Sequence, residues 1–473
     1  MSPSAEEQEL EERKRKRIAA AAAEEEEEQE EEDEEEEEDE EEEDAALTAT
    51  LAAIQAACLP HLDGSFTSIY CGREPGSLTI KRARKDLNLY FQELGPTVFR
   101  RMYRMHEEDF YKLYDILEPK LPVLTRQRGK TPNGDITNLH RLAMALRFMA
   151  GGERYDIAGV HGVHPGQVYK SLWMIVDAIN NTAALDIVFP TSHEKQREMA
   201  AQFADRSKCG FNNCVAAKDG MLVWTNKPSE KMDDMGIGNG KFFSGRKSKF
   251  GLNMQAICDA NRRFVDVYVG HPGSASDYTM WLESPVRKLI EKTPGFLCPG
   301  LVIYGDNAYV NTMTTVSPFK AVSSGPKDAF NFYHSQLRIT IEGAFGSLVH
   351  RWGCLRKPLP MNFRVSKMSR LVVALCKLHN FCIDCKHGDT PPSTPMDLFY
   401  ISSEGGIPVP TSEYRVDALL DGGDFNEDVG NFNRKRSRAS TAPSLEELPI
   451  YEMLRHIEVH GYKRPPANIR TRN

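Results

Sequence analysis

The spacing of apolar residues changes near Asn213, and this change limits the chain to few fold classes. From about residue 87 to residue 205, apolar residues recur at helical spacing. Along Phe250–Cys258 and Val265–Val269 they alternate instead, which is the period of a β-strand. The sequence therefore predicts a helical segment followed by a mixed α/β domain.

The α/β part has an order of elements that indicates a mixed sheet covered by helices. The turn Asp259–Arg262 joins two strand patterns into an antiparallel hairpin beside the first strand. We predict strands at 214–225, 250–258, 265–269 and 301–304, an irregular stretch through Phe332, and helices at 278–292, 337–352 and 365–385.

Two helices in the first part have the spacing of a helix-turn-helix. Tyr155–His161 is predicted as a short helix, and Pro165 stands at the opening of a second helix, Gly166–Asn180. Such a second helix can lie in the major groove of DNA, with Gln167 and Lys170 as the candidate contacts. A helical hairpin that only packs against the rest of the protein explains the pattern as well.

A block of negative charge at Glu24–Asp44 conceals a basic remainder. Twenty of its 21 residues are Asp or Glu, so the net charge of −9 becomes +11 outside the block. A basic body favours contact with a polyanion such as nucleic acid, and the acidic block could screen that contact. A soluble protein of this size can also carry such an excess without a polyanionic partner.

Composition divides the chain further. The basic cluster Arg13–Arg17 is of the kind that nuclear import receptors bind, so we expect the protein in the nucleus, with the cytoplasm as a second compartment. No apolar run is long enough to span a membrane, and the N-terminus has no secretory signal. The predicted parts are a disordered tail (1–45), a linker (46–86), a helical segment (87–205), an α/β domain (206–388) and a polar, largely disordered tail (389–473).

Three acidic residues lie where a buried charge needs a partner. Asp219 interrupts an apolar strand, Asp306 follows another strand, and Glu342 lies among apolar residues of the long helix. Each could pair separately with an arginine. If the two strand ends meet this helix, the carboxylates would suit Mg²⁺ or Mn²⁺, and two such ions about 3.5–4 Å apart can promote phosphodiester hydrolysis.

Four sequence blocks around these residues resemble those of Harbinger-type transposases and of the nucleases derived from them, within the Asp-Asp-Glu superfamily. The blocks occur in the family's order, over roughly 206–388, and 35 residues separate Asp306 from Glu342. The resemblance implies a ribonuclease-H-like fold with Asp219, Asp306 and Glu342 as catalytic metal ligands. The blocks are Lys218–Gly220, His271–Asp277, Gly305–Tyr309 and Ile341–Gly346.

The resemblance also implies roles that the residues alone do not show. Asp219 would bridge two ions, and cleavage would leave a 3′-OH that, in a transposase, attacks target DNA. Asp277 matches a fourth acidic position and is either a further metal ligand or the N-cap of the helix that follows. The family often has Arg after the helix glutamate, where this chain has Gly343. A Myb-like companion protein and a homodimer are further expectations.

A glycine-punctuated loop at Gly240–Lys249 carries cations and two aromatic residues between predicted strands. Lys241, Arg246, Lys247 and Lys249 are candidate DNA contacts, because such a loop can follow a phosphate backbone and stack on an unpaired base. A solvated loop without a ligand is the alternative.

Two further groups of polar residues lie on the predicted C-terminal helices. His334 and Arg338 precede Glu342 on its face of the long helix, where they orient a ligand, contact phosphate or form an ordinary surface network. The Cys and His residues between Cys376 and Cys385 are predicted to pack in the core. Steps of three along one helix place the first and last of them about 13.5 Å apart, too far for one zinc ion.

These patterns and the resemblance predict a divalent-metal-dependent DNA endonuclease or transposase. The rival interpretation is a non-catalytic DNA-binding or adaptor protein that has kept the nuclease fold.

Overall fold

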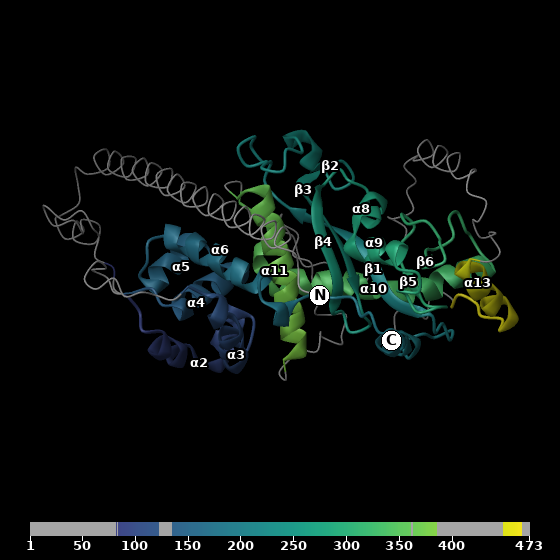
Figure 1. Ribbon diagram of the computed structural model, residues 1–473, viewed down its shortest axis with the longest axis horizontal. Helices are drawn as coiled ribbons and strands as arrows, with labels where there is room; N and C mark the ends of the chain where they lie inside the picture. Colours follow the sequence, from purple (N-terminus) through teal and green to yellow (C-terminus); the bar gives the residue numbers. More distant parts are fainter. Residues whose placement is uncertain (1–81, 83, 123–134, 361–362, 386–447, 466–473) are drawn as a thin grey trace, which may run out of the picture.

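The protein has a helical part and an α/β part, which lie on either side of helix α11 (Val365–Asp384) (Figure 1). Helix α11 packs against helix α6 (Gly166–Asn180) on one side and strand β4 (Phe264–Pro272) on the other. One hydrophobic cluster runs through both parts. The computed structural model describes residues 82, 84–122, 135–360, 363–385 and 448–465.

Several predicted segments lie outside the described residues. They include the whole tail at 1–45 with its basic and acidic runs, nearly all of the linker at 46–86, and residues 389–447 of the C-terminal tail. Among the helices that are described, none combines the length and the apolar character needed to cross a bilayer.

The helical part confirms the predicted helix pair. Helix α5 (Arg154–His161) ends at Gly162, whose φ of 62° is a left-handed conformation that glycine adopts without strain. Helix α6 follows with Pro165 as its N-cap. The other α-helices of this part are α2 (Leu87–Tyr103), α3 (Glu107–Leu117) and α4 (Asn138–Met149).

The α/β part contains a mixed six-stranded sheet, as predicted. Strand β1 pairs antiparallel with β3 and parallel with β5, while β3 also pairs antiparallel with β4 in the predicted hairpin. Two short strands complete the sheet, with β2 beside β3 and β6 beside β5. The bounds are β1 (Cys214–Trp224), β2 (Phe243–Ser244), β3 (Lys249–Cys258), β5 (Val302–Tyr304) and β6 (Thr315–Val316).

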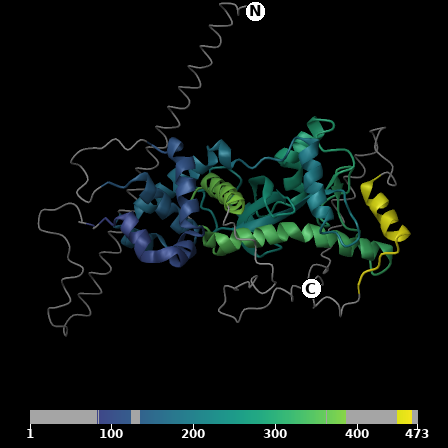
Figure 2. The same ribbon diagram turned by 90° about the horizontal axis from the view of Figure 1, so that it is seen from below.

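Helices cover both faces of this sheet. Helix α10 (Pro326–Arg351) and α11 pack on one face, and α10 runs along its whole width (Figure 2). Helices α7 (His193–Ala204), α8 (Asp277–Glu283) and α9 (Pro285–Lys292) cover the other face around a separate apolar cluster. Strand β3 is buried on both faces, from Gly251 to Cys258. The predicted fold class, a mixed α/β sheet flanked by helices, is confirmed.

Two predicted helix boundaries are wrong. The helix expected at 278–292 is two helices, because Ser284 caps the second one and Pro285 occupies its first position. The long helix begins at Pro326, so residues expected to be irregular through Phe332 are helical.

A further helix lies in the segment predicted as a polar tail. Helix α13 (Pro449–Val459) buries Ile450, Met453, Leu454 and Ile457 beside the first turns of α10. The hydroxyl of Tyr304 donates to the sulfur of Met453 at 3.8 Å. The end of the chain that the structure describes is thus part of the α/β core.

Candidate metal centre

The sheet opens beside strand β1 because its parallel neighbour β5 is short. Strand β5 pairs with β1 only as far as Ala217, opposite Tyr304. Asp219 therefore lies two residues beyond the last pair on β1, and Asp306 lies two residues beyond the end of β5. The carboxyl ends of neighbouring parallel strands share one edge, so the two side chains meet there.

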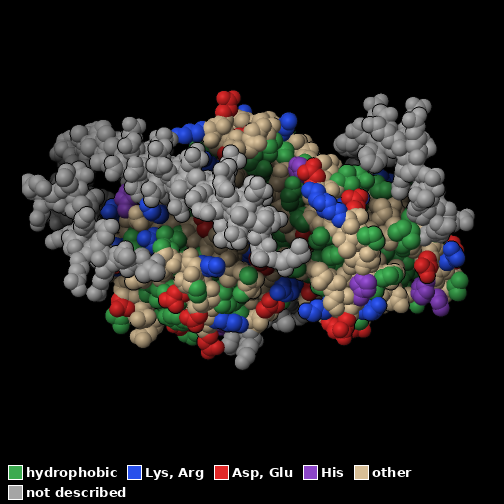
Figure 3. All heavy atoms as spheres, viewed as in Figure 1, with side chains coloured by type: hydrophobic (Ala, Val, Ile, Leu, Met, Phe, Trp, Pro, Cys, Tyr) green, Lys and Arg blue, Asp and Glu red, His purple; other side chains and the backbone are tan. Residues whose placement is uncertain are grey.

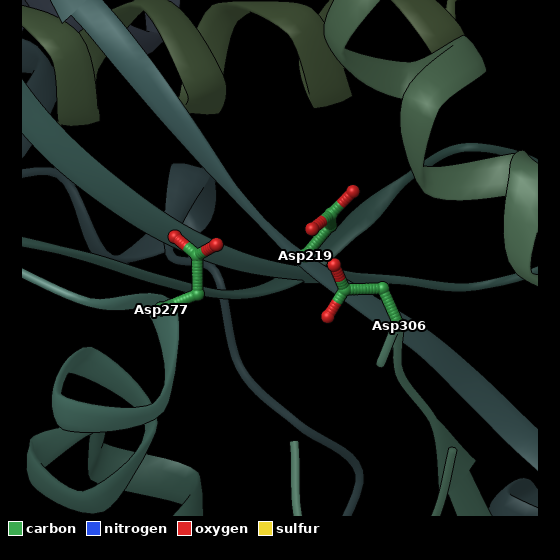
Figure 4. A group of neighbouring side chains, drawn as sticks. All are labelled: Asp219, Asp277 and Asp306. Carbon is green, nitrogen blue, oxygen red and sulfur yellow. The ribbon is translucent and has the colours of Figure 1, made fainter. Parts of the chain in front are cut away.

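A third carboxylate reaches this opening from the first residue of α8. Ligand oxygen atoms of Asp219, Asp277 and Asp306 all lie within 4.8 Å of one another (Figure 4). Asp277 is buried, while Asp219 and Asp306 are half-buried. The predicted meeting of Asp219 and Asp306 is present in the structure.

The role of Asp277 as an N-cap is excluded by its neighbour. The Ser276 side chain accepts a hydrogen bond from the backbone N–H of Thr279 at 3.1 Å, so Ser276 is the cap. Asp277 is the next residue, and its carboxylate turns toward Gly220 of strand β1. A Cβ atom at Gly220 would lie 2.1 Å from Asp277 Oδ1, so only glycine leaves room for this carboxylate.

The surroundings of Asp219 and Asp277 disfavour the negative charges of these two carboxylates. Burial raises the pKa of Asp219 to about 7; the charge of Asp306 adds to this rise, and Arg338 opposes it. Burial also raises the pKa of Asp277, with Arg246 opposing. A cation among the carboxylates would reverse these shifts, because it stabilises the ionised forms.

Glu342 does not belong to this group of three. It lies on α10 with 43% of its side chain exposed, and it accepts a hydrogen bond from Arg338, one turn earlier on the helix. The same nitrogen of Arg338 also donates to Asp219 Oδ2 at 3.3 Å. Of the expected set, Glu342 is thus linked to Asp219 only through Arg338, and Asp277 takes its place beside Asp219 and Asp306.

The donor atoms suit a hard divalent cation. Mg²⁺ lies about 2.1 Å from each oxygen ligand, so ligands on opposite sides of the ion are about 4.2 Å apart. The spread of 4.8 Å among the three aspartates is close to that span. Carboxylate oxygens favour Mg²⁺ or Mn²⁺ over softer metals.

Buried polar residues hold the aspartates in place through hydrogen bonds. The sequence did not single these residues out. The Tyr309 hydroxyl donates to Gln255 Oε1 at 2.9 Å, and Gln255 Nε2 donates to the backbone oxygen of Asp219 at 3.1 Å. Asn253 Nδ2 lies 3.5 Å from Asp277 Oδ1. A sequence signal did exist, because Asn253 and Gln255 are polar residues inside a strand that is otherwise apolar.

Lys218 is the most buried cation next to the centre. Its side chain is fully buried, and burial lowers its pKa well below the usual value. Nζ donates to Thr315 Oγ1 at 3.1 Å and lies 3.3 Å from the centre of the Trp281 ring. Lys218 points to the α8 face of the sheet, whereas Asp219 points toward α10. The contacts of Lys218 therefore hold strand β1 on the face opposite Asp219.

The predicted DNA-binding loop approaches the metal centre at Arg246. Arg246 Nη1 lies 3.8 Å from Asp277 Oδ2, with 69% of the arginine side chain exposed. Lys241 and Lys247 are exposed, whereas Lys249 is half-buried and its Nζ lies 3.1 Å from the centre of the Trp224 ring. Three of the four predicted cations are thus exposed on this loop, and Arg246 is the one that approaches a carboxylate.

The helix-turn-helix candidates lie elsewhere. On α6, Gln167 is half-buried and Lys170 is exposed. This helix and the metal centre are on opposite sides of α11 (Figure 1). The structure does not bring these two residues to the carboxylates.

Known proteins resemble the part of the chain that builds the centre. Residues 218–380 match the family model described as DDE superfamily endonuclease. "Protein ALP1-like" from Arabidopsis thaliana is 24% identical over 327 residues, which are 66% of this chain and 78% of that protein. The human and bovine proteins named "Putative nuclease HARBI1" are each 22% identical over 297 residues, 62% of this chain and 79% of the relative.

No solved structure matches the chain. The matched residues begin at Lys218 and include all four acidic residues, with Arg338 and most of α11. Residues 218–380 are therefore similar to a DDE superfamily endonuclease domain.

Proposed function

We propose that the protein is a divalent-metal-dependent DNA endonuclease of Harbinger type that hydrolyses phosphodiester bonds. The observation that carries this proposal is the meeting of the Asp219, Asp277 and Asp306 carboxylates within 4.8 Å inside the matched domain. The nuclease named among the relatives supports the same chemistry.

In this proposal Asp219, Asp277 and Asp306 hold the metal, and Glu342 is a fourth carboxylate within reach of Asp219 through Arg338. Bound Mg²⁺ or Mn²⁺, as one ion or as a pair, would supply positive charge at the phosphate and lower the pKa of the attacking water. Because Asp219 is held at its backbone by Gln255, the ligands are already positioned before substrate arrives.

The chain's own cations would position the DNA. Lys241, Arg246 and Lys247 are exposed on the loop that approaches the centre at Arg246, and cations of this kind bind phosphates without reading sequence. The exposed aromatic ring of Phe243, on the same loop, offers a surface for an unpaired base. Cleavage that leaves a 3′-OH, and transfer of that end to target DNA, extend the proposal.

Cleavage of duplex DNA with terminal-repeat sequences tests the function. We expect the unaltered protein to cut with Mg²⁺ or Mn²⁺ and to stop in excess EDTA. Asp219→Asn, Asp277→Asn and Asp306→Asn should each lower the cleavage rate by roughly 10²- to 10³-fold, because each removes a charged ligand of the same size. DNA binding, measured by fluorescence anisotropy, should stay within about threefold.

Asp328→Asn is the matched control, because Asp328 pairs with Arg464 near the start of α10, away from the centre. Unchanged cleavage by any of the three aspartate variants would refute that residue's assignment.

One observation favours a non-catalytic alternative. The Glu342 carboxylate is exposed and paired with Arg338 instead of grouped with the aspartates. A DNA-binding or adaptor protein that has lost cleavage would show this arrangement. Such a protein would bind the same duplex but yield no metal-dependent product in the assay above.

Localisation in the nucleus, a Myb-like companion and a homodimer remain predictions of the sequence. The basic cluster Arg13–Arg17 on which the first depends lies outside the described residues.

A further inference from the structure

Arg338 is a cation placed among the carboxylates. Its Nη1 atom donates to Asp219 Oδ2 at 3.3 Å and also to Glu342 Oε1. Only 14% of its side chain is exposed. The neighbouring charges of Glu342, Asp219 and Asp306 outweigh burial and raise the pKa of Arg338, so the guanidinium stays charged.

The Arg338 guanidinium donates hydrogen bonds to one proposed metal ligand and to one carboxylate outside the three aspartates. Asp219 belongs to the three aspartates that meet within 4.8 Å, whereas Glu342 does not. A guanidinium and a divalent cation repel each other and attract the same oxygens. The position of Arg338 therefore affects both the affinity for a cation and the freedom of Glu342.

Arg246 also lies near a carboxylate of the centre, but it is much more exposed to solvent than Arg338. It approaches Asp277 at 3.8 Å, but 69% of its side chain is exposed, so solvent and salt screen its charge. Arg338 is largely shielded from water and makes two hydrogen bonds. Of these two arginines, Arg338 has the stronger electrostatic influence on the centre.

We propose that Arg338 is a built-in competitor of the divalent cation, which weakens metal binding and withholds Glu342 from the centre by pairing with Asp219 and Glu342. This inference rests on the proposed metal-dependent function. Arg338 is a positioning residue in this scheme, because it acts on the ligands and not on the DNA phosphate.

Calorimetric titration of the full-length protein with Mn²⁺ tests the inference without DNA. We expect Arg338→Gln to bind Mn²⁺ roughly tenfold more tightly than the unaltered protein, because one positive charge near a divalent ion is removed. Arg338→Lys keeps the charge, so its affinity should lie closer to that of the unaltered protein than to that of Arg338→Gln. Circular dichroism confirms that each variant is folded.

Arg464→Gln is the matched control. This substitution breaks the ion pair between Arg464 and Asp328, whose atoms lie 2.7 Å apart. Asp328 is on α10, as is Arg338, and the substitution changes the net charge by the same amount as Arg338→Gln. Its affinity for Mn²⁺ should not change. An Arg338→Gln protein that binds Mn²⁺ no more tightly than the unaltered protein overturns the inference.

A double-mutant cycle tests the second half of the proposal, that Arg338 withholds Glu342. Glu342→Gln should weaken Mn²⁺ binding more in the Arg338→Gln protein than in the unaltered protein. Equal effects in the two backgrounds would show that Arg338 does not restrain Glu342, and would overturn this half.

Failure of the inference and failure of the proposed function are distinguishable. The titrations measure Mn²⁺ affinity alone, and the cleavage assay measures product. Equal Mn²⁺ affinities with normal cleavage reject the role of Arg338 only, whereas tighter binding by Arg338→Gln without cleavage in any protein rejects the endonuclease only.

Discussion

Two glycines of the α/β part leave room for a charged side chain from another element. A Cβ atom at Gly220 would collide with Asp277, and one at Gly343 would lie 2.8 Å from Arg262 Nε. The arginine that the resembling family often has after the helix glutamate is glycine here. A guanidinium from the turn between β3 and β4 fills the space beside it.

Asp266 is a buried carboxylate outside the metal centre whose ionisation opposes folding. Its side chain is buried on β4, its Oδ2 atom has no hydrogen-bond partner, and burial raises its pKa to about 7. The unfolded chain has the ordinary value near 4, so between pH 4 and pH 7 the folded state binds more protons. Stability contributed by this residue is therefore present at pH 4 and lost as pH rises to 7.

We predict that Asp266→Asn flattens this pH dependence. The free energy of unfolding in urea is measured for both proteins at pH 4 and pH 8. The value for the variant minus the value for the unaltered protein should increase by roughly 2–4 kcal/mol from pH 4 to pH 8. Asp205→Asn, at an exposed position at the end of α7, is the control and should keep the original slope. A slope shared by both variants and the unaltered protein would contradict the prediction.

At the level of single residues, the sequence predicted the aspartates but not their supports. Asp219 and Asp306 were recognisable because charges in or after apolar strands are rare. Asp277 could not be assigned, since an acidic residue before a helix serves as a cap or as a ligand, and only the hydrogen bond of Ser276 decides. Gln255 escaped notice because its two side-chain partners, Asp219 and Tyr309, are distant from it in the sequence.

Among the elements, helix α10 shows why a periodic pattern can be lost. Its buried residues recur at helical spacing from Ala329 to Leu348, but His334 occupies one of these positions. The imidazole is stacked on Tyr304 and hydrogen-bonds to the backbone oxygen of Val316, so a polar residue is satisfied within the core. The sequence alone places the start of the helix too late for this reason.

Helix α13 was missed because it follows a long polar stretch, yet it should contribute to stability. Ile457 is 1% exposed, and the same helix carries Val459 at 79% exposed. We expect Ile457→Ala to lower the free energy of unfolding by about 2–4 kcal/mol, because it leaves a cavity.

Val459→Ala is the matched control on the same helix and should change stability by less than about 0.5 kcal/mol. Urea unfolding measures both variants. Equal effects of the two substitutions would mean that α13 does not pack as described.

For the whole molecule, the position of the basic loop predicts where DNA lies. Each phosphate contact by a lysine contributes about −0.9 to the slope of log affinity against log salt. Lys241→Gln and Lys247→Gln should each reduce that slope by about one, because both side chains are exposed on the loop whose Arg246 lies 3.8 Å from Asp277.

Lys170→Gln tests the helix-turn-helix interpretation in the same assay, and Lys288→Gln, at an exposed position on α9, is the control. Binding is measured by anisotropy between 50 and 200 mM salt. A slope that falls only for Lys170→Gln would place the DNA on the helical part and away from the loop.

Helix α10 makes the molecule a single mechanical unit. At one end Arg351 donates to the backbone oxygen of Arg104 in the helical part, and at the other end Asp328 pairs with Arg464 beyond α13. Arg338 and Glu342 are located between these anchors on a rod about 39 Å long. Any twist that a partner imposes on the helical bundle would be carried along this rod to the acidic pocket, so in the proposed endonuclease DNA recognition and cleavage would share this helix.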